Sequence, residues 1–175
     1  ARHAGGVIHR DLKPENIFLA EQHGTTVVKL VDWGIAKMMV RPADAIDVTG
    51  IGTMVGTPRY IAPEQARGQT VDERTDVYSL GAIAHELFLE APVFSCDNVA
   101  DLLAAHLREP VAPPHDVWPD IPPRLEALLL GMLEKEGASR PSVAEVIAAL
   151  EQVKRDLGER ITHVRAVGSG PVTSA

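Results

Sequence analysis

The sequence predicts a mainly helical domain of the α+β class with one short β-hairpin near its beginning. Apolar residues recur at helical spacing in several segments between residues 72 and 157, and two β-prone runs lie close together before residue 32. Hydrophobic residues make up 45% of the 175 positions, which suffices for one domain with its own core. Only 4% are aromatic, so we expect aliphatic side chains and Ala to fill the interior.

The charge and cysteine content exclude several classes of protein. The chain has 17 basic and 24 acidic residues and a net charge of −7, which argues against nucleic acid or an anionic membrane as a partner. Cys96 is the single cysteine and has no internal disulfide partner, which fits a reducing cytoplasm. No apolar run approaches the roughly 20 residues that a membrane helix needs. We therefore expect a cytoplasmic domain without membrane contact in these residues, and an anchor outside them is compatible with this.

Residues 9–16, His-Arg-Asp-Leu-Lys-Pro-Glu-Asn, are expected to form a loop, because Pro14 disfavours a regular helix or central strand. Asp11 can accept a proton from a hydroxyl, and Lys13 offers a positive charge to a phosphoryl group. Asn16 and the later Asp32 offer oxygen ligands that suit Mg²⁺. This set of groups suits a polyphosphate with a divalent metal.

A hairpin is predicted directly after this loop. The runs 17–19 and 26–31 are β-prone, and they flank Glu21, Gln22, His23 and Gly24. Such a hairpin would return the chain so that Asp32 lies beside Asn16. Two metal ligands that are distant in sequence could then share one ion.

Residues 35–61 lack a clear periodicity and contain several glycines and prolines, which predicts a long loop. Loops of this length are uncommon in compact domains unless they are functional. This one contains Thr49, Thr53 and Thr57.

Residues 72–89 are apolar nearly all round, which predicts a helix in the centre of the domain. Its apolar stripe comprises Val77, Leu80, Ala84 and Leu87. Asp76, near the start, would be a buried carboxylate that needs hydrogen-bond donors. The alternative is an aspartate that is merely favoured by the helix dipole.

Three further helices complete the predicted domain. Periodicity predicts helices over 97–107 and 124–133, and a proline-rich connector joins them. Ser142 and Glu145 form a capping box that opens a final helix, which we expect to end at Leu157. The small and turn-forming residues from Gly158 onward predict a flexible tail or linker over 158–175.

The octet at 9–16 resembles the catalytic loop of protein kinases, and Asp32-Trp33-Gly34 is similar to their metal-binding triplet, with Trp where Phe is usual. Residues 56–64, Gly-Thr-Pro-Arg-Tyr-Ile-Ala-Pro-Glu, resemble the end of the kinase activation segment. Residues 72–89 resemble the buried helix that follows that segment. The sequences of residues 62–68 and 76–81 are most similar to those of bacterial Ser/Thr kinases of the eukaryotic type.

The resemblance implies a kinase-like C-terminal lobe over residues 1–157, with a catalytic loop at 9–16, a metal triplet at 32–34 and an activation segment at 32–64. It implies ATP with Mg²⁺, or Mn²⁺ in its place, and protein substrates phosphorylated on Ser or Thr. The N-terminal lobe, with its Gly-rich loop, strand Lys and helix Glu, is absent from this sequence. We therefore expect a partial chain that is nearly inactive without that lobe as its partner.

The resemblance also assigns roles at the site. Asp11, Lys13 and Asn16 would be catalytic, and Asn16 with Asp32 would hold the metal. Phe18 would lie under the adenine ring; a core aromatic on a strand is the alternative. The implied cofactor-binding residues are Lys13, Glu15, Asn16, Phe18 and Asp32.

A second group of residues would regulate or support the site. Arg10 would hold a phosphate on Thr49 or Thr53; the alternative is that these two hydroxyls are ordinary solvated groups. Thr57 would form a hydrogen bond to the catalytic Asp and Lys. The implied structural residues are His9, Glu64, Asp76 and Arg140. Asp76 would hold the backbone of the catalytic loop, and Arg140 would pair with Glu64 unless it is a solvated residue before a helix.

Two other functions fit part of the pattern. A catalytically inactive kinase-like lobe could serve as a binding or scaffold module, although the intact set of polar residues argues against degeneration. Small-molecule phosphotransferases of the aminoglycoside type also use an HxDxxxxN loop, but they generally lack a lysine placed like Lys13 and a segment like 62–64.

Overall fold

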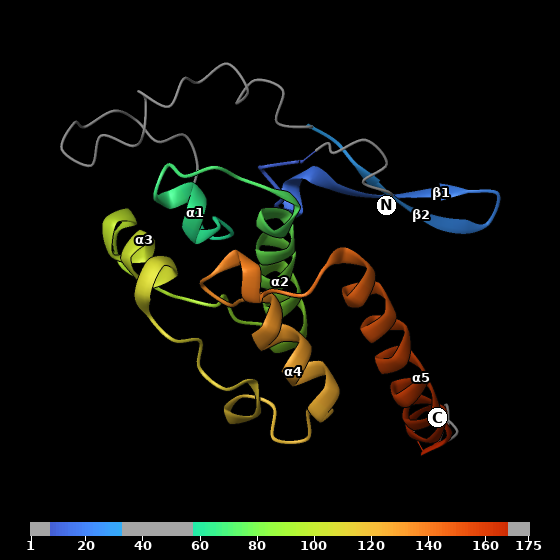
Figure 1. The fold of residues 1–175 in the computed structure, drawn as a ribbon. Helices are drawn as coiled ribbons and strands as arrows, with labels where there is room; N and C mark the ends of the chain where they lie inside the picture. Colours follow the sequence, from blue (N-terminus) through green and yellow to red (C-terminus); the bar gives the residue numbers. More distant parts are fainter. Residues whose placement is uncertain (1–7, 33–57, 168–175) are drawn as a thin grey trace, which may run out of the picture.

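The structure is a computed structural model that describes residues 8–32 and 58–167. Residues 158–167 are described by their backbone alone. A β-hairpin comes first and extends sideways from a group of helices (Figure 1). The elements, in chain order, are η1 (Pro14–Asn16), β1 (Ile17–Gln22), β2 (Thr25–Leu30), α1 (Pro63–Ala66), α2 (Glu73–Leu89), α3 (Val99–Arg108), η4 (Pro114–Asp116), α4 (Pro123–Met132), η5 (Gly137–Ser139) and α5 (Val143–Val167).

The hairpin is a two-stranded antiparallel sheet in which Ile17 lies opposite Leu30 and Gln22 opposite Thr25. Its turn consists of His23 and Gly24 alone, with φ angles of 51° and 75°. Two positive φ angles are what the favoured two-residue hairpin turn requires, and His tolerates them better than most residues do. The hairpin is therefore confirmed, but its turn is shorter than predicted because Gln22 continues the ladder.

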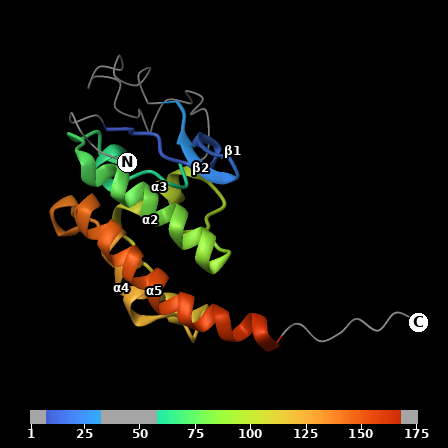
Figure 2. The same cartoon turned by 90° about the vertical axis from the view of Figure 1, so that its right-hand side faces the viewer.

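Helix α2 lies at the centre of the group of helices and packs against several of them. One cluster of buried residues joins it to α4 and α5: Val77, Leu128, Met132 and Val146. A second joins it to α1: Ala62, Tyr78, Ala82 and Leu133. Figure 2 shows α2 running between the hairpin side and the layer formed by α4 and α5. The prediction of a central helix over 72–89 is confirmed, with Asp72 as its N-cap.

The apolar stripe predicted on α2 is only partly correct. Val77 is 2% exposed, but Leu80 and Leu87 are 37% and 75% exposed. The buried side of the helix instead includes the polar residues Thr75, Asp76 and Ser79. Their side chains form hydrogen bonds, so they can occupy positions that an apolar pattern alone assigns to Leu.

The final helix begins where predicted and ends later. Ser142 N donates to Glu145 Oε2 over 2.7 Å and Glu145 N donates to Ser142 Oγ over 3.3 Å, which confirms the capping box. Helix α5 continues to Val167, so the predicted start of a tail at Gly158 is wrong. One glycine inside a helix costs only about 1 kcal/mol relative to Ala, and good helix formers follow it. None of the described helices is long and apolar enough to cross a membrane.

We predict that Gly81→Ala destabilises the contact between α2 and α4. A Cβ at Gly81 would lie 2.8 Å from the Cβ of Met132, so the two helices would have to move apart. Such overpacking costs about 1–3 kcal/mol of unfolding free energy, measured by urea denaturation. Gly131→Ala is the matched control, because a Cβ there would meet only Pro141 Cδ at 3.8 Å. Equal stability of the two variants would contradict the close approach of the helices.

Candidate active site

The loop that begins at His9 is held through its backbone by α2. His9 N and Arg10 N donate to Asp76 Oδ2 and Oδ1 over 2.8 and 2.9 Å. Asp76 is only 7% exposed, and these two donors compensate its carboxylate for lost water. The contact expected between Asp76 and the loop backbone is therefore present.

Two further contacts fix the same part of the loop. The His9 ring, 1% exposed, bonds Val31 O through Nε2 over 3.0 Å and so connects the loop to the end of the hairpin. Gln65 Nε2 donates to Arg10 O over 2.6 Å. Sequence analysis missed Gln65, because its only local signal is a position three residues after the helix cap.

Asp11 and Lys13 lie together at the surface of the loop. Lys13 Nζ is 3.2 Å from Asp11 Oδ2, and their side chains are 39% and 30% exposed. Exposed ion pairs of this kind contribute about 0–1 kcal/mol. The ammonium group can therefore leave Asp11 for an anionic ligand at little cost.

Asn16 and Asp32 provide oxygen atoms that suit a hard cation. Asn16 Nδ2 donates to Asp11 O over 2.8 Å, which leaves Oδ1 as the atom that can coordinate. Val31 N donates to Asn16 O over 3.0 Å, so the exposed Asp32 directly follows a residue that is bonded to the backbone of Asn16. Mg²⁺ prefers such oxygens and takes its remaining ligands from water and substrate phosphates. The donor set fits this ion, although among the described residues no group of three or more His, Cys, Asp or Glu could hold a metal.

The other two residues predicted to bind the cofactor lie at the surface. Glu15 is exposed in η1. Phe18 is 53% exposed on β1, so the alternative that it is a core aromatic is wrong. Leu19 and Val28, which face each other across the hairpin, are 73% and 60% exposed. Both faces of the hairpin therefore carry exposed apolar side chains, Phe18 on one face and Leu19 with Val28 on the other.

The predicted regulatory residues are described only in part. Thr49, Thr53 and Thr57 lie outside the described residues, and so do Trp33 and Gly34 of the metal triplet. Arg10 has a φ angle of 67°, and its buried Nε has no hydrogen-bond partner among the described residues.

Glu64 and Arg140 form the predicted ion pair. Arg140 Nη1 and Nη2 lie 2.7 and 2.8 Å from Glu64 Oε1 and Oε2, a bidentate geometry. Arg140 is 2% exposed, and Thr75 Oγ1 also donates to Glu64 Oε1 over 2.7 Å. Burial alone would raise the pKa of Glu64, but the hydrogen bonds from Arg140 and Thr75 hold that pKa below its usual range. The remaining guanidinium bonds go to the carbonyl oxygens of Arg74, Glu134 and Lys135.

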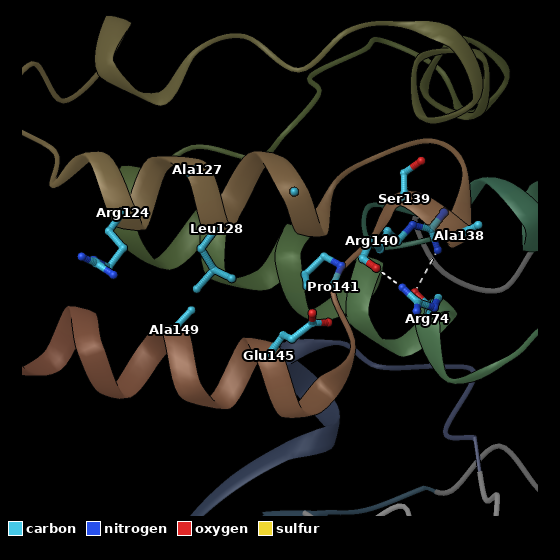
Figure 3. A pocket seen from close by; sticks show the side chains of 11 residues that line it. Arg74, Arg124, Ala127, Leu128, Ala138, Ser139, Arg140, Pro141, Glu145 and Ala149 are labelled. Carbon is cyan, nitrogen blue, oxygen red and sulfur yellow. Dashed lines mark hydrogen bonds between the residues drawn. The ribbon is translucent and has the colours of Figure 1, made fainter.

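A groove of about 530 Å³ lies elsewhere, between α4 and α5 (Figure 3). Leu128 and Ala149 give it an apolar lining, and Arg124 and Arg74 stand at opposite ends. None of the proposed catalytic side chains on the loop lines this groove. It is therefore separate from the candidate site.

The sequence profile of the protein kinase domain matches residues 2–150. The chain belongs to the protein kinase family. This kinase sequence is 44% identical over 154 residues to serine/threonine-protein kinase Pkn1 of Myxococcus xanthus, an alignment covering 86% of this chain and 22% of that protein. It is 41% identical over 150 residues to pkn3 of the same organism, covering 84% and 27%.

Serine/threonine-protein kinase PknB of Mycolicibacterium smegmatis is 39% identical over 152 residues, covering 86% of this chain and 24% of that protein. The kinase chain therefore spans about a quarter of the length of these relatives. Their names support the Ser/Thr class, and the match supports the resemblance to bacterial kinases of the eukaryotic type.

We predict strong coupling between Glu64 and Arg140 in a double-mutant cycle. Glu64→Gln or Arg140→Met alone should lower the unfolding free energy by about 3–5 kcal/mol, because each leaves a buried group without its partner. The double variant should lose less than the sum of the two.

Acid pH gives a second measure of the same pair. The pKa of Glu64 is lowered in the folded protein, so its contribution to stability is present above its unfolded pKa and is lost as the pH falls through its folded pKa. Glu64→Gln should therefore weaken the loss of stability at acid pH. The coupling would be contradicted if the effects in the cycle were additive and Glu64→Gln lost as much stability at acid pH as the wild type.

Proposed function

We propose that residues 1–157 are the large, C-terminal lobe of a protein serine/threonine kinase, which in the complete enzyme transfers the γ-phosphoryl group of ATP to Ser or Thr hydroxyls of proteins. One observation carries this proposal. A loop anchored on Asp76 presents Asp11, Lys13 and Asn16, and the hairpin returns Asp32 to the same place. Family membership supports ATP and Mg²⁺ as cofactors.

In this proposal Asp11 orients the substrate hydroxyl and accepts its proton. Lys13 lies 3.2 Å from the Asp11 carboxylate and balances its charge before substrate binds. It then turns toward the transferring phosphoryl group, a movement that the weak surface pair permits.

Asn16 and Asp32 would hold Mg²⁺, which when bound neutralises charge on the phosphate oxygens. Asn16 is suited to this because the bond from its Nδ2 to Asp11 O fixes the amide and turns Oδ1 away from that carbonyl. Phe18 offers an exposed ring to the adenine, and the exposed Glu15 precedes it by three residues.

The partner proposed for this lobe is a small N-terminal lobe. The Gly-rich loop, strand Lys and helix Glu that such a lobe supplies do not occur in these 175 residues. Phe18 and the cross-strand pair Leu19 and Val28 lie on opposite faces of the hairpin, and we propose that the nucleotide covers the first face and that Leu19 and Val28 are open to a partner.

We predict that Asp11→Asn in the complete protein lowers phosphorylation of a generic basic protein by about 10²–10⁴-fold with Mg-ATP, because the proton acceptor is lost. Asp120→Asn, at an exposed position far along the chain, is the matched control and should be fully active. Radiolabel transfer from ATP measures both. Full activity of Asp11→Asn would refute the assignment of the base.

The isolated chain of residues 1–175 provides a second arm of this test. Losing even one preorganised donor lowers rates by roughly 10²–10³-fold, so this chain should turn over far below the range of about 1–100 s⁻¹ typical of kinases. Turnover within that range, abolished by Asp11→Asn, would show that a small lobe is dispensable. An inactive complete protein would favour the alternative of a binding or scaffold module.

We also predict that activity of the complete protein depends on phosphate at Thr49 or Thr53. The buried Nε of the Arg10 guanidinium has no hydrogen-bond partner in residues 8–32 and 58–167, and a guanidinium suits a doubly charged phosphate. The Thr49→Ala, Thr53→Ala double variant should lose most activity, and Arg10→Lys should resemble it. If the double variant is phosphate-free by mass spectrometry yet fully active, this regulation is wrong.

A further inference from the structure

The side-chain amide of Gln65 bonds two backbone groups that belong to different parts of the protein. Its Oε1 accepts from Ala62 N over 3.1 Å, and its Nε2 donates to Arg10 O over 2.6 Å. The first bond is local, because Gln or Glu three residues after a helix cap commonly bonds the cap N–H. The second bond connects α1 to the catalytic loop and has no such local explanation.

The second bond completes the support of one residue in that loop. Asp76 Oδ1 accepts from Arg10 N over 2.9 Å, so both polar backbone groups of Arg10 are held by side chains, one from α2 and one from α1. Arg10 has a φ angle of 67°, in the left-handed region that residues other than glycine rarely adopt. Such a conformation persists only where its surroundings enforce it.

The Arg10 carbonyl belongs to the planar peptide bond that leads into Asp11. The direction of this carbonyl therefore fixes where the Asp11 side chain starts. Helix α1 is itself anchored, because the neighbouring Glu64 is paired with Arg140. The bond from Gln65 thus relates the direction of Asp11 to a part of the protein that is tied to the core.

We infer that Gln65 is a positioning residue for Asp11, which acts by clamping the Arg10 carbonyl to the start of α1. This inference rests on the proposed function, since it gives Asp11 the role of the base. An amide can perform both tasks, because it accepts through oxygen and donates through nitrogen. A glutamate could cap Ala62 but would place a carboxylate oxygen against the Arg10 carbonyl.

The test compares Gln65→Glu, Gln65→Met and the matched control Gln69→Glu in the complete protein. Gln69 is an exposed glutamine just beyond α1, so its variant makes the same chemical change outside the clamp. Gln65→Glu retains the local cap and loses the donor, whereas Gln65→Met loses both bonds. The measurements are kcat and KM for ATP, the melting temperature, and hydrogen exchange of peptides covering residues 9–13.

We expect both Gln65 variants to lower kcat about tenfold, with the KM for ATP within about twofold of wild type, because the base is misdirected while the nucleotide contacts remain. Exchange in residues 9–13 should quicken in both variants and stay unchanged in Gln69→Glu. If Gln65→Glu is fully active and only Gln65→Met is impaired, Gln65 acts only as a helix cap, and the inference is overturned. Equal loss of kcat, KM and melting temperature would mean a general structural role, which also overturns it.

The hydrogen-exchange arm separates this inference from the proposed function. If the wild-type complete protein transfers no phosphate, the proposed function fails. Hydrogen exchange in residues 9–13 still decides whether Gln65 holds the loop. Exchange that is faster in Gln65→Glu than in Gln69→Glu supports the clamp, and equal exchange in the two variants refutes it.

Discussion

The buried carboxylate of Asp76 is the group on which the arrangement of the site depends. It lies in the first turns of α2, where the helix dipole favours a negative charge, and it receives two consecutive N–H groups from a loop 66 and 67 positions away in sequence. A carboxylate removed from water is unfavourable unless such donors meet it. The central helix and the loop therefore stabilise each other, and the position of one determines the position of the other.

The same end of α2 also anchors α1 and the segment that precedes it. Thr75 Oγ1 donates to Glu64 Oε1 and Ser79 Oγ donates to Tyr60 O, each over 2.7 Å. Residues three and four apart lie on one face of a helix, so Thr75, Asp76 and Ser79 present neighbouring polar groups inside the domain. Hydrogen bonds are directional, whereas apolar contacts tolerate sliding. This polar face thus fixes the loop and α1 at defined positions relative to each other.

The sequence predicted the elements that local patterns control: the hairpin, the central helix and the capping box of Ser142. The distant contacts of Asp76 with the loop and of Arg140 with Glu64 were expected only from the resemblance to kinases, and local patterns predicted none of the others. One of the contacts that no local pattern indicated is that of His106, which is fully buried against Tyr78, whose hydroxyl lies 2.9 Å from Nδ1. Burial, together with the nearby charge of Lys135, lowers the pKa of His106 to about 4, so the ring is neutral inside the domain. The exposure of Leu87 was missed for a related reason, since periodicity identifies apolar faces but not which of them acquires a neighbour.

Three supports of the loop end on its backbone atoms: His9 N, Arg10 N and Arg10 O. The groups proposed for chemistry are side chains, and those of Asp11 and Lys13 remain partly exposed to solvent. Geometry and chemistry are therefore supplied by different atoms of the same short segment. A change at a support moves the loop and alters every reacting group together, whereas a change at Asp11 removes one chemical step and leaves the backbone in place. Substitutions at the supports and at the loop side chains should therefore have different effects. The contacts with the helices determine the stability of the loop, whereas the loop side chains determine the catalytic rate.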